Sequence, residues 1–213
     1  MGEKGKMKKG KRIIAVFLMI VLAISLCGCE DTSEMLYGTW ETTIDYSAAM
    51  EEDLGSGYED FHQSFEIRMM FEFKEDGTYS MYADEESTKE TIDNWINAFV
   101  PYSVEVMYKQ FEKKGVSREE ADAAIQAQYG CSLEEYKWNE IRSEVNPDDY
   151  LSESKSDGVF KAKKNKLFLD GEKGYEVFTI EGDTLTIDLP EGAEVEMIDG
   201  IEYPLVFTKV VIE

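Results

Sequence analysis

The chain has few of the side chains on which metal and enzyme chemistry usually depend. Its 213 residues include one histidine, His62, and three cysteines, Cys27, Cys29 and Cys131. A zinc site needs several histidine or cysteine ligands, and the acidic runs lack the alternating spacing of a calcium loop. The sequence also lacks a nucleophile elbow, in which a serine sits between two glycines at a strand-to-helix turn. We therefore expect a non-catalytic protein with no metal and no cofactor.

Basic residues are scarce after residue 28. The first 28 residues hold six of the 22 Lys and Arg side chains and one of the 45 Asp and Glu side chains, which leaves 16 against 44. The remaining 185 residues therefore carry a formal charge of −28. Nucleic acids and anionic membranes are usually bound through basic patches. We therefore expect no nucleic-acid partner, and we expect an anionic membrane surface to repel the chain, so that a lipid must supply the anchoring.

Residues 1–28 have the pattern of an export signal. A basic start precedes the apolar run Ile13–Leu26, which is shorter than a comfortable membrane span. The following Leu26-Cys27-Gly28-Cys29 resembles the lipobox of bacterial lipoprotein precursors, with Cys29 as the acylated residue. Cys27 is the poorer acceptor because Leu26 would occupy its cleavage position. The resemblance implies fatty acyl chains such as palmitate on Cys29, an anchor on the extracytoplasmic face of the cell membrane, and a tether over 29–36.

Period-two alternation predicts a β-rich domain over 37–213. In the clearest strand, alternate residues from Phe65 to Phe73 are apolar, and Glu75-Asp76-Gly77 follows as a hairpin turn. Up to nine strands, mostly joined by tight turns, predict an antiparallel up-and-down barrel of eight or nine strands. They are expected at 40–46, 65–74, 78–83, 159–162, 167–169, 175–180, 184–189, 195–198 and 203–211. Residues 48–60, rich in glycine and acids, are expected to form an interrupting loop.

A helical insertion is predicted at about 86–147. Ser87, Ser117 and Ser132 each open a capping-box pattern, and Gly130 is a plausible C-cap. Pro101 should restart or kink the first helix, and Asn146-Pro147 should end the last one. The helices are too short to be stable alone, so we expect them to dock on the barrel, at its open mouth.

The strand pattern carries a second resemblance. Gly38-Thr39-Trp40 is similar to the Gly-x-Trp motif that opens the first strand of lipocalin-like, or calycin-type, barrels. The segments 73–79, 179–185 and 207–210 are similar to small lipocalin-like domains of bacterial surface lipoproteins. The resemblance covers about 37–84 and 157–212 and implies that Trp40 packs at one barrel end. The Arg that packs on this Trp in the family is absent from the sequence pattern.

Apolar side chains on the inward strand faces make a candidate ligand cavity. They are Phe65, Ile67, Met69, Phe71, Phe73, Tyr79, Leu185 and Ile187. A barrel of this size either fills itself with side chains or holds one small ligand, and large aromatics favour filling. The leading hypothesis is a binding domain for a small apolar ligand or an envelope protein. The alternative is a protein-interaction or chaperone-like module that acts through the helical insertion, whose residues 108–139 resemble the helical arms of exported foldases and chaperones.

Overall fold

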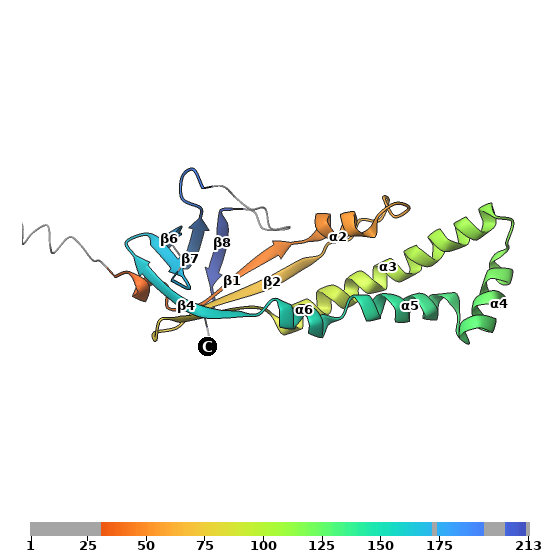
Figure 1. Cartoon of the computed structure of the whole chain (residues 1–213), viewed down its shortest axis with the longest axis horizontal. Helices are drawn as coiled ribbons and strands as arrows, with labels where there is room; N and C mark the ends of the chain where they lie inside the picture. Colours follow the sequence, from red (N-terminus) through yellow and green to blue (C-terminus); the bar gives the residue numbers. More distant parts are fainter. Residues whose placement is uncertain (1–30, 172–173, 194–202, 212–213) are drawn as a thin grey trace, which may run out of the picture.

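The computed structural model describes residues 31–171, 174–193 and 203–211. The described part consists of a β-barrel with a long helical arm between its third and fourth strands (Figure 1). No helix in these ranges has both the length and the apolar character needed to cross a membrane. The elements in chain order are η1 (Ser33–Met35), β1 (Gly38–Asp45), α2 (Ser47–Leu54), β2 (Glu66–Phe73), β3 (Thr78–Ala83), α3 (Glu85–Lys113), α4 (Arg118–Tyr129), α5 (Leu133–Glu144), α6 (Pro147–Glu153), β4 (Ser156–Lys163), β5 (Lys166–Leu169), β6 (Glu176–Glu181), β7 (Thr184–Asp188) and β8 (Leu205–Lys209).

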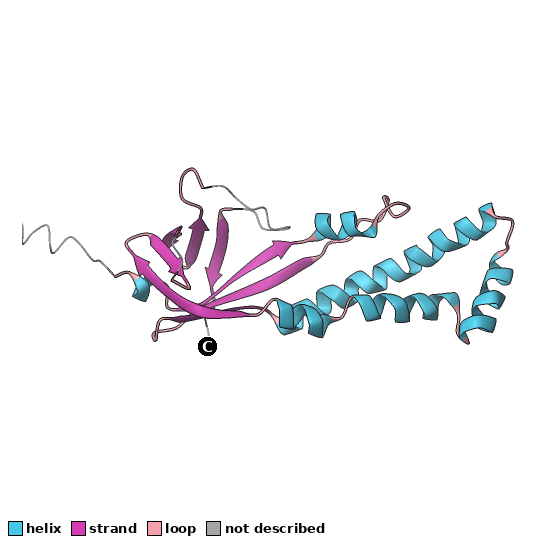
Figure 2. Ribbon diagram, viewed as in Figure 1, coloured by secondary structure: helices cyan, strands magenta, loops and turns pink. Residues whose placement is uncertain are grey.

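The eight strands form a closed antiparallel barrel in which each strand pairs with the next along the chain and β8 pairs back with β1 (Figure 2). This confirms the predicted up-and-down, lipocalin-like barrel with added helices. Positive φ values at the glycines of the β2–β3 and β6–β7 turns, Gly77 and Gly182, fit the tight hairpins read from the sequence. The strand predicted at 195–198 lies outside the described residues.

The β1–β2 hairpin continues beyond the closed part of the sheet. Strand β8 pairs with β1 at Trp40 and Glu41, and β3 pairs with β2 only from Met69 onward. The outer pairs, such as Ile44 with Ile67, therefore have no third strand beside them in the described register. We call this part the extended hairpin, and Figure 1 shows it running from the barrel toward α2.

The helical arm is built around α3. Figure 1 shows α5 lying along α3, with α4 across the far end and α6 near the barrel. Arg118 at the start of α4 makes two hydrogen bonds to Glu105 of α3, of 2.7 and 3.0 Å, and one of 2.9 Å to Glu112. Helix α3 docks on β2, where Thr91 Oγ1 donates to the Glu66 carbonyl oxygen at 2.9 Å. The helices therefore dock on the extended hairpin.

The capping-box prediction is confirmed for α4, confirmed only for the N-cap bond of α5, and wrong for α3. Ser117 forms a full capping box with Glu120, Ser132 caps α5, and Gly130 ends α4 in the left-handed conformation. Helix α3 begins earlier than predicted because the Asp84 carboxylate accepts a hydrogen bond from the Ser87 N–H at 2.9 Å.

Three local predictions on the helices are corrected. Helix α3 continues through Pro101 as one helix of 29 residues, so the chain does not restart a helix at the proline. Asn146-Pro147 starts a helix where an end was expected, since the Asn146 side chain accepts from Asp148 N–H and Pro147 is the first helical residue. Helix α2 takes up residues 48–54 of the predicted loop and begins at Ser47, whose N–H donates to the Asp45 carboxylate at 2.8 Å.

Buried side chains form two separate clusters. The barrel core fills the closed sheet and contains Leu36, Trp40, Phe71, Phe73, Tyr79, Phe160, Ala162, Leu167, Phe178, Leu185, Ile187 and Phe207. The junction core lies between the extended hairpin and the helices and contains Ile44, Phe61, Phe65, Ile67, Met69, Ala83, Ile92, Trp95, Ile96, Phe99, Val100 and Ile141.

Candidate functional site

The eight residues predicted to line one ligand cavity are divided between the two cores. The barrel core holds Phe71, Phe73, Tyr79, Leu185 and Ile187, whereas the junction core holds Phe65, Ile67 and Met69. The division follows from β2, whose inward face points into the closed barrel near Phe73 and toward α3 near Ile67. The structure therefore does not bring these eight residues together around one space.

Aromatic rings occupy the inside of the barrel. The Phe71 and Phe73 ring centroids are 4.2 Å apart, and Phe73 packs on Phe160 at 4.8 Å. Phe71 also contacts Tyr79 at 5.4 Å and Phe207 at 6.1 Å. Each of these side chains is at most 7% exposed. An eight-stranded barrel is just wide enough for its side chains to fill, and these rings occupy much of its described interior.

Trp40 is part of the barrel core. Its ring is fully buried, and its Nε1 donates a hydrogen bond of 2.7 Å to the Leu36 carbonyl oxygen. Lys209 Nζ lies 5.0 Å from the ring centroid, where the lysine makes a cation–π contact with Trp40. Gly38 has a φ of +118°, and a Cβ there would lie 3.2 Å from Lys209 Cε. The glycine thus permits both the backbone conformation and the approach of the lysine.

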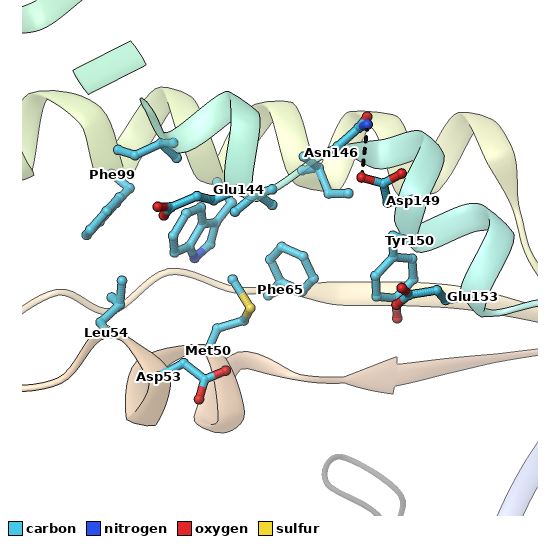
Figure 3. Close-up of a pocket in the computed structure, with 14 residues that line it drawn as sticks. Met50, Asp53, Leu54, Phe65, Phe99, Glu144, Asn146, Asp149, Tyr150 and Glu153 are labelled. Carbon is cyan, nitrogen blue, oxygen red and sulfur yellow. Dashed lines mark hydrogen bonds between the residues drawn. The ribbon is translucent and has the colours of Figure 1, made fainter. Parts of the chain in front are cut away.

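The junction core borders a cleft of about 520 Å³, which Figure 3 shows from close by. Met50 and Leu54 of α2 form one side, and Phe65 lies between them and the helices of the arm. The apolar wall on the arm side is completed by Ile92, Trp95, Phe99, Ile141, Val145 and Tyr150. A cleft of this volume and apolar character matches the sites that proteins use for small molecules.

Trp95 is the central ring of this wall. It stacks on Phe99 at 4.8 Å and meets Phe65 edge-on at 6.2 Å, and it is 2% exposed. Phe61, in the loop after α2, packs edge-on against Trp95 with a distance of 5.9 Å between the ring centroids. These contacts fix the rings from several elements, so the wall is preformed.

The cleft has acidic side chains around its apolar wall. Asp53, Glu144, Asp149 and Glu153 come from α2, α5 and α6, and Asp149 accepts a hydrogen bond from Asn146 Nδ2 at 3.2 Å. None of these four carboxylates has a basic partner among the described residues. An apolar wall bordered by uncompensated negative charge is suited to a ligand with an apolar body and a positive group.

Tyr150 contributes a neutral polar group to the same cleft. Burial and the neighbouring Tyr46 raise the pKa of Tyr150 well above its ordinary value. The two rings pack edge-on at 6.4 Å. Its hydroxyl therefore keeps its proton throughout the physiological range and adds no charge to the cleft.

The described residues Cys131 and His62 are not part of the cleft lining. Cys29 lies outside the described residues. Cys131 is a partly exposed free thiol before the α5 cap, and exposed His62 hydrogen-bonds Glu51 at 2.9 Å. Within the described ranges, no group of three or more His, Cys, Asp or Glu side chains is arranged to hold a metal ion.

Sequence reasoning missed the cleft because four helices contribute to it and two of them, α2 and α6, were not predicted. Local signals for both exist. Met50 and Leu54 have the i, i+4 spacing of one helix face, and Asn146-Pro147-Asp148 has the form of an N-cap followed by proline.

Comparison with known proteins gives no match for this chain among family models, curated proteins or solved structures.

Proposed function

We propose that this chain is a non-catalytic binding domain, held by lipid on the extracytoplasmic face of a cell membrane, that binds a small apolar ligand with a positive group. The observation that carries the proposal is the 520 Å³ cleft, with its wall of fixed aromatic rings and its acidic border. The ligand site is thus assigned to the junction of barrel and arm, since the described barrel core is packed with its own rings.

The acids and the apolar wall have different roles in this proposal. Desolvation of the ligand's apolar body against rings such as Trp95 supplies most of the affinity. Asp53, Glu144 and Glu153 are exposed, so their attraction for a cation is weakened by salt and mainly sets specificity. Binding is therefore expected to depend strongly on the length of the apolar body and moderately on charge.

Calorimetric titration with octylammonium and with octanoate tests the ligand class, because the two probes share an apolar chain and differ in charge. We expect octylammonium to bind about tenfold more tightly than octanoate at low salt, with the difference reduced at high salt. Equal affinity, or tighter binding of octanoate, would contradict the assigned charge preference.

Neutralising substitutions separate the border acids from the overall negative charge. Asp53→Asn combined with Glu153→Gln should weaken octylammonium binding by roughly three- to tenfold while leaving octanoate binding no weaker. The matched control, Glu90→Gln combined with Glu181→Gln, removes two exposed charges that do not line the cleft. If both double variants weaken binding equally, the effect comes from net charge and not from the cleft.

The anchor has an independent test. Cys29→Ala should abolish incorporation of an alkyne fatty acid in cells, whereas Cys27→Ala should retain it. Label that persists in Cys29→Ala and disappears in Cys27→Ala would assign the acyl group to Cys27.

An exposed aromatic pair at the far end of the arm favours a second candidate function, the binding of an envelope protein. Tyr129 is 48% exposed, and its ring lies 4.5 Å from that of Tyr136. Exposed aromatic residues are enriched where proteins bind one another. A photo-crosslinking residue at position 129 should then give a discrete adduct in cells that is absent when the same residue is placed at exposed Lys113. No adduct at position 129 would remove this candidate.

A further inference from the structure

The β4–β5 hairpin concentrates positive charge in an otherwise acidic chain. Lys161, Lys163, Lys164 and Lys166 are four of the 16 basic residues that follow residue 28, and the segment 158–169 contains no acid. All four side chains are exposed. By contrast, residues 84–153, which include the arm, carry 17 acidic and seven basic side chains.

The outer face of this hairpin combines the lysines with apolar side chains. Val159, Lys161 and Lys163 alternate with the inward Phe160 and Ala162 along β4. The register places Phe168 opposite Lys161 and Lys166 opposite Lys163. Two like charges directly opposite each other in a sheet are unfavourable. Lys163 and Lys166 thus place two positive charges opposite each other on this hairpin.

A shallow hollow lies on this face. It has a volume of about 420 Å³, and its lining includes Val159, Lys161, Lys163 and Phe168. Val159 is 54% exposed. Apolar side chains beside lysines are typical of surfaces that meet the boundary between lipid headgroups and acyl chains.

The start of the described chain is hydrogen-bonded to the same hairpin. Asp31 forms a β-bridge with Lys163, Thr32 Oγ1 donates to the Lys164 carbonyl oxygen at 2.7 Å, and Ser33 Oγ accepts from Ala162 N–H at 3.0 Å. Cys29 is two residues before Asp31, so their Cα atoms are within about 8 Å of each other. Figure 1 shows this end of the barrel opposite the α4 end of the arm.

We propose that the outer face of the β4–β5 hairpin lies on an anionic lipid surface, with Lys161, Lys163 and Lys164 at the lipid phosphates and Val159 and Phe168 at the acyl boundary. The proposal rests on the acyl anchor at Cys29 proposed above. The anchor holds the chain to any membrane, whereas the lysines select negatively charged lipid and orient the barrel on it. The acidic arm then points away from the membrane and keeps the cleft open to solution.

One nearby acid offsets part of the positive charge of this face: hydrogen bonds from Ser33 and the charges of Lys161 and Lys163 lower the pKa of Asp31, so its carboxylate stays ionised. The Asp31 carboxylate accepts a hydrogen bond from Ser33 N–H, and the Asp157 carboxylate accepts one from Ser80 Oγ. Asp170 accepts from the Tyr79 hydroxyl and from Val159 N–H. Lys166 is engaged with a ring, its Nζ lying 3.9 Å from the centroid of Tyr175. The three lysines named in the proposal make no side-chain ion pair with a described residue.

Lysine acetylation on vesicles tests the proposal. The acylated protein is extracted from cells and reconstituted in vesicles of phosphatidylcholine or of equal parts phosphatidylcholine and phosphatidylglycerol. We expect acetylation of Lys161, Lys163 and Lys164 to slow by roughly three- to tenfold on the anionic vesicles, and high salt to reverse the effect. Lys109, Lys113 and Lys114 at the far end of α3 are the internal controls and should change less than about twofold.

The two vesicle types separate failure of the anchor from failure of the proposal. Protein that does not float with phosphatidylcholine vesicles has no working lipid anchor. Two results would overturn the proposed contact in protein that floats with both vesicle types. One is acetylation of the hairpin lysines at the same rate on both vesicle types, and the other is equal protection of the hairpin and distal lysines on anionic vesicles.

A charge-reversal pair gives the matched control. Lys161→Glu with Lys163→Glu should still float with both vesicle types but lose the protection of Lys164 on anionic lipid. Lys113→Glu with Lys114→Glu makes the same change in net charge at the distal end and should keep that protection. Loss of protection in both double variants would show that net charge, and not the hairpin, controls the contact.

Discussion

The barrel core and the junction core both receive side chains from β1, β2 and β3 but leave different amounts of space for a ligand. Inside the closed sheet, side chains of β1 and β2 meet those of six other strands, and their rings fill the space. Along the extended hairpin, the same inward faces meet helices, and a cleft of about 520 Å³ remains beside them. A closed barrel of eight strands has a narrow interior, and side chains take up most of it. The helices of the arm and α2 pack on the extended hairpin without enclosing it, and the cleft lies between them. Ligand binding is therefore expected where the barrel stops and not where it closes.

The largest expected effect is on the stability of the barrel core. Trp40→Ala removes a fully buried ring, its hydrogen bond to Leu36 and its contact with Lys209. The free energy of unfolding should fall by about 3–5 kcal/mol. Trp138→Ala, at a half-buried position of the arm, should cost less than about 2 kcal/mol. Equal losses in denaturant titrations would contradict the structural role given to Trp40.

A matched pair of isoleucines compares the two cores directly. Ile187 in the barrel core and Ile92 in the cleft wall are each 1% exposed. Ile187→Ala leaves an enclosed void and should cost about 3–5 kcal/mol, whereas Ile92→Ala enlarges an open cleft and should cost about 2–3 kcal/mol. Octylammonium affinity, measured by calorimetry on folded protein, should change only in Ile92→Ala. A change of affinity in Ile187→Ala alone would place the ligand in the barrel.

Two glycines separate backbone strain from steric contact. Gly38 and Gly115 both have positive φ, but only Gly38 has a neighbour, Lys209 Cε, within 3.2 Å of a built Cβ. Gly115→Ala should cost about 1 kcal/mol from strain alone, and Gly38→Ala about 2 kcal/mol because the lysine must also move. Thermal unfolding of both variants measures the difference. Identical costs would mean that Lys209 yields freely and does not brace Trp40.

The smallest effect is expected at the far end of the arm. The hydrogen bonds from Arg118 hold the pKa of Glu105 below its ordinary value of 4.5. A lowered folded-state pKa contributes stability above the ordinary value, and that contribution is lost as the pH falls through the folded-state pKa. Arg118→Ala should therefore reduce hydrogen-exchange protection in α4 by less than about fivefold at neutral pH. At a pH below the folded-state and unfolded-state pKa values of Glu105, the part of the effect that depends on the ionised Glu105 should disappear. Loss of protection in the barrel strands would show that the arm and the barrel unfold together.

The strands of the barrel could be predicted from local sequence, but the position of the cleft could not. Alternation from Phe65 to Phe73 and the glycines at the turns identified the hairpins, because strand period and turn chemistry are local properties. The division of β2 between two cores depends on where β8 and β3 stop pairing, which is a long-range property of barrel closure. Helices α2 and α6 had local signals at Asp45-x-Ser47 and Asn146-Pro147, but glycines and acids around the first, and the proline in the second, favoured a loop and a helix end.

Methyl NMR of the labelled protein during titration with octylammonium tests most directly whether the ligand site lies at the junction or in the barrel. A ligand at the junction should change the chemical shifts of methyl groups in the cleft and leave those of the barrel core unchanged. The cleft reporters are Met50, Leu54, Ile92, Ile141 and Val145, and the barrel reporters are Leu167, Leu185 and Ile187. Chemical-shift changes at the three barrel residues, with the cleft residues unchanged, would contradict a site at the junction and place the ligand in the barrel interior.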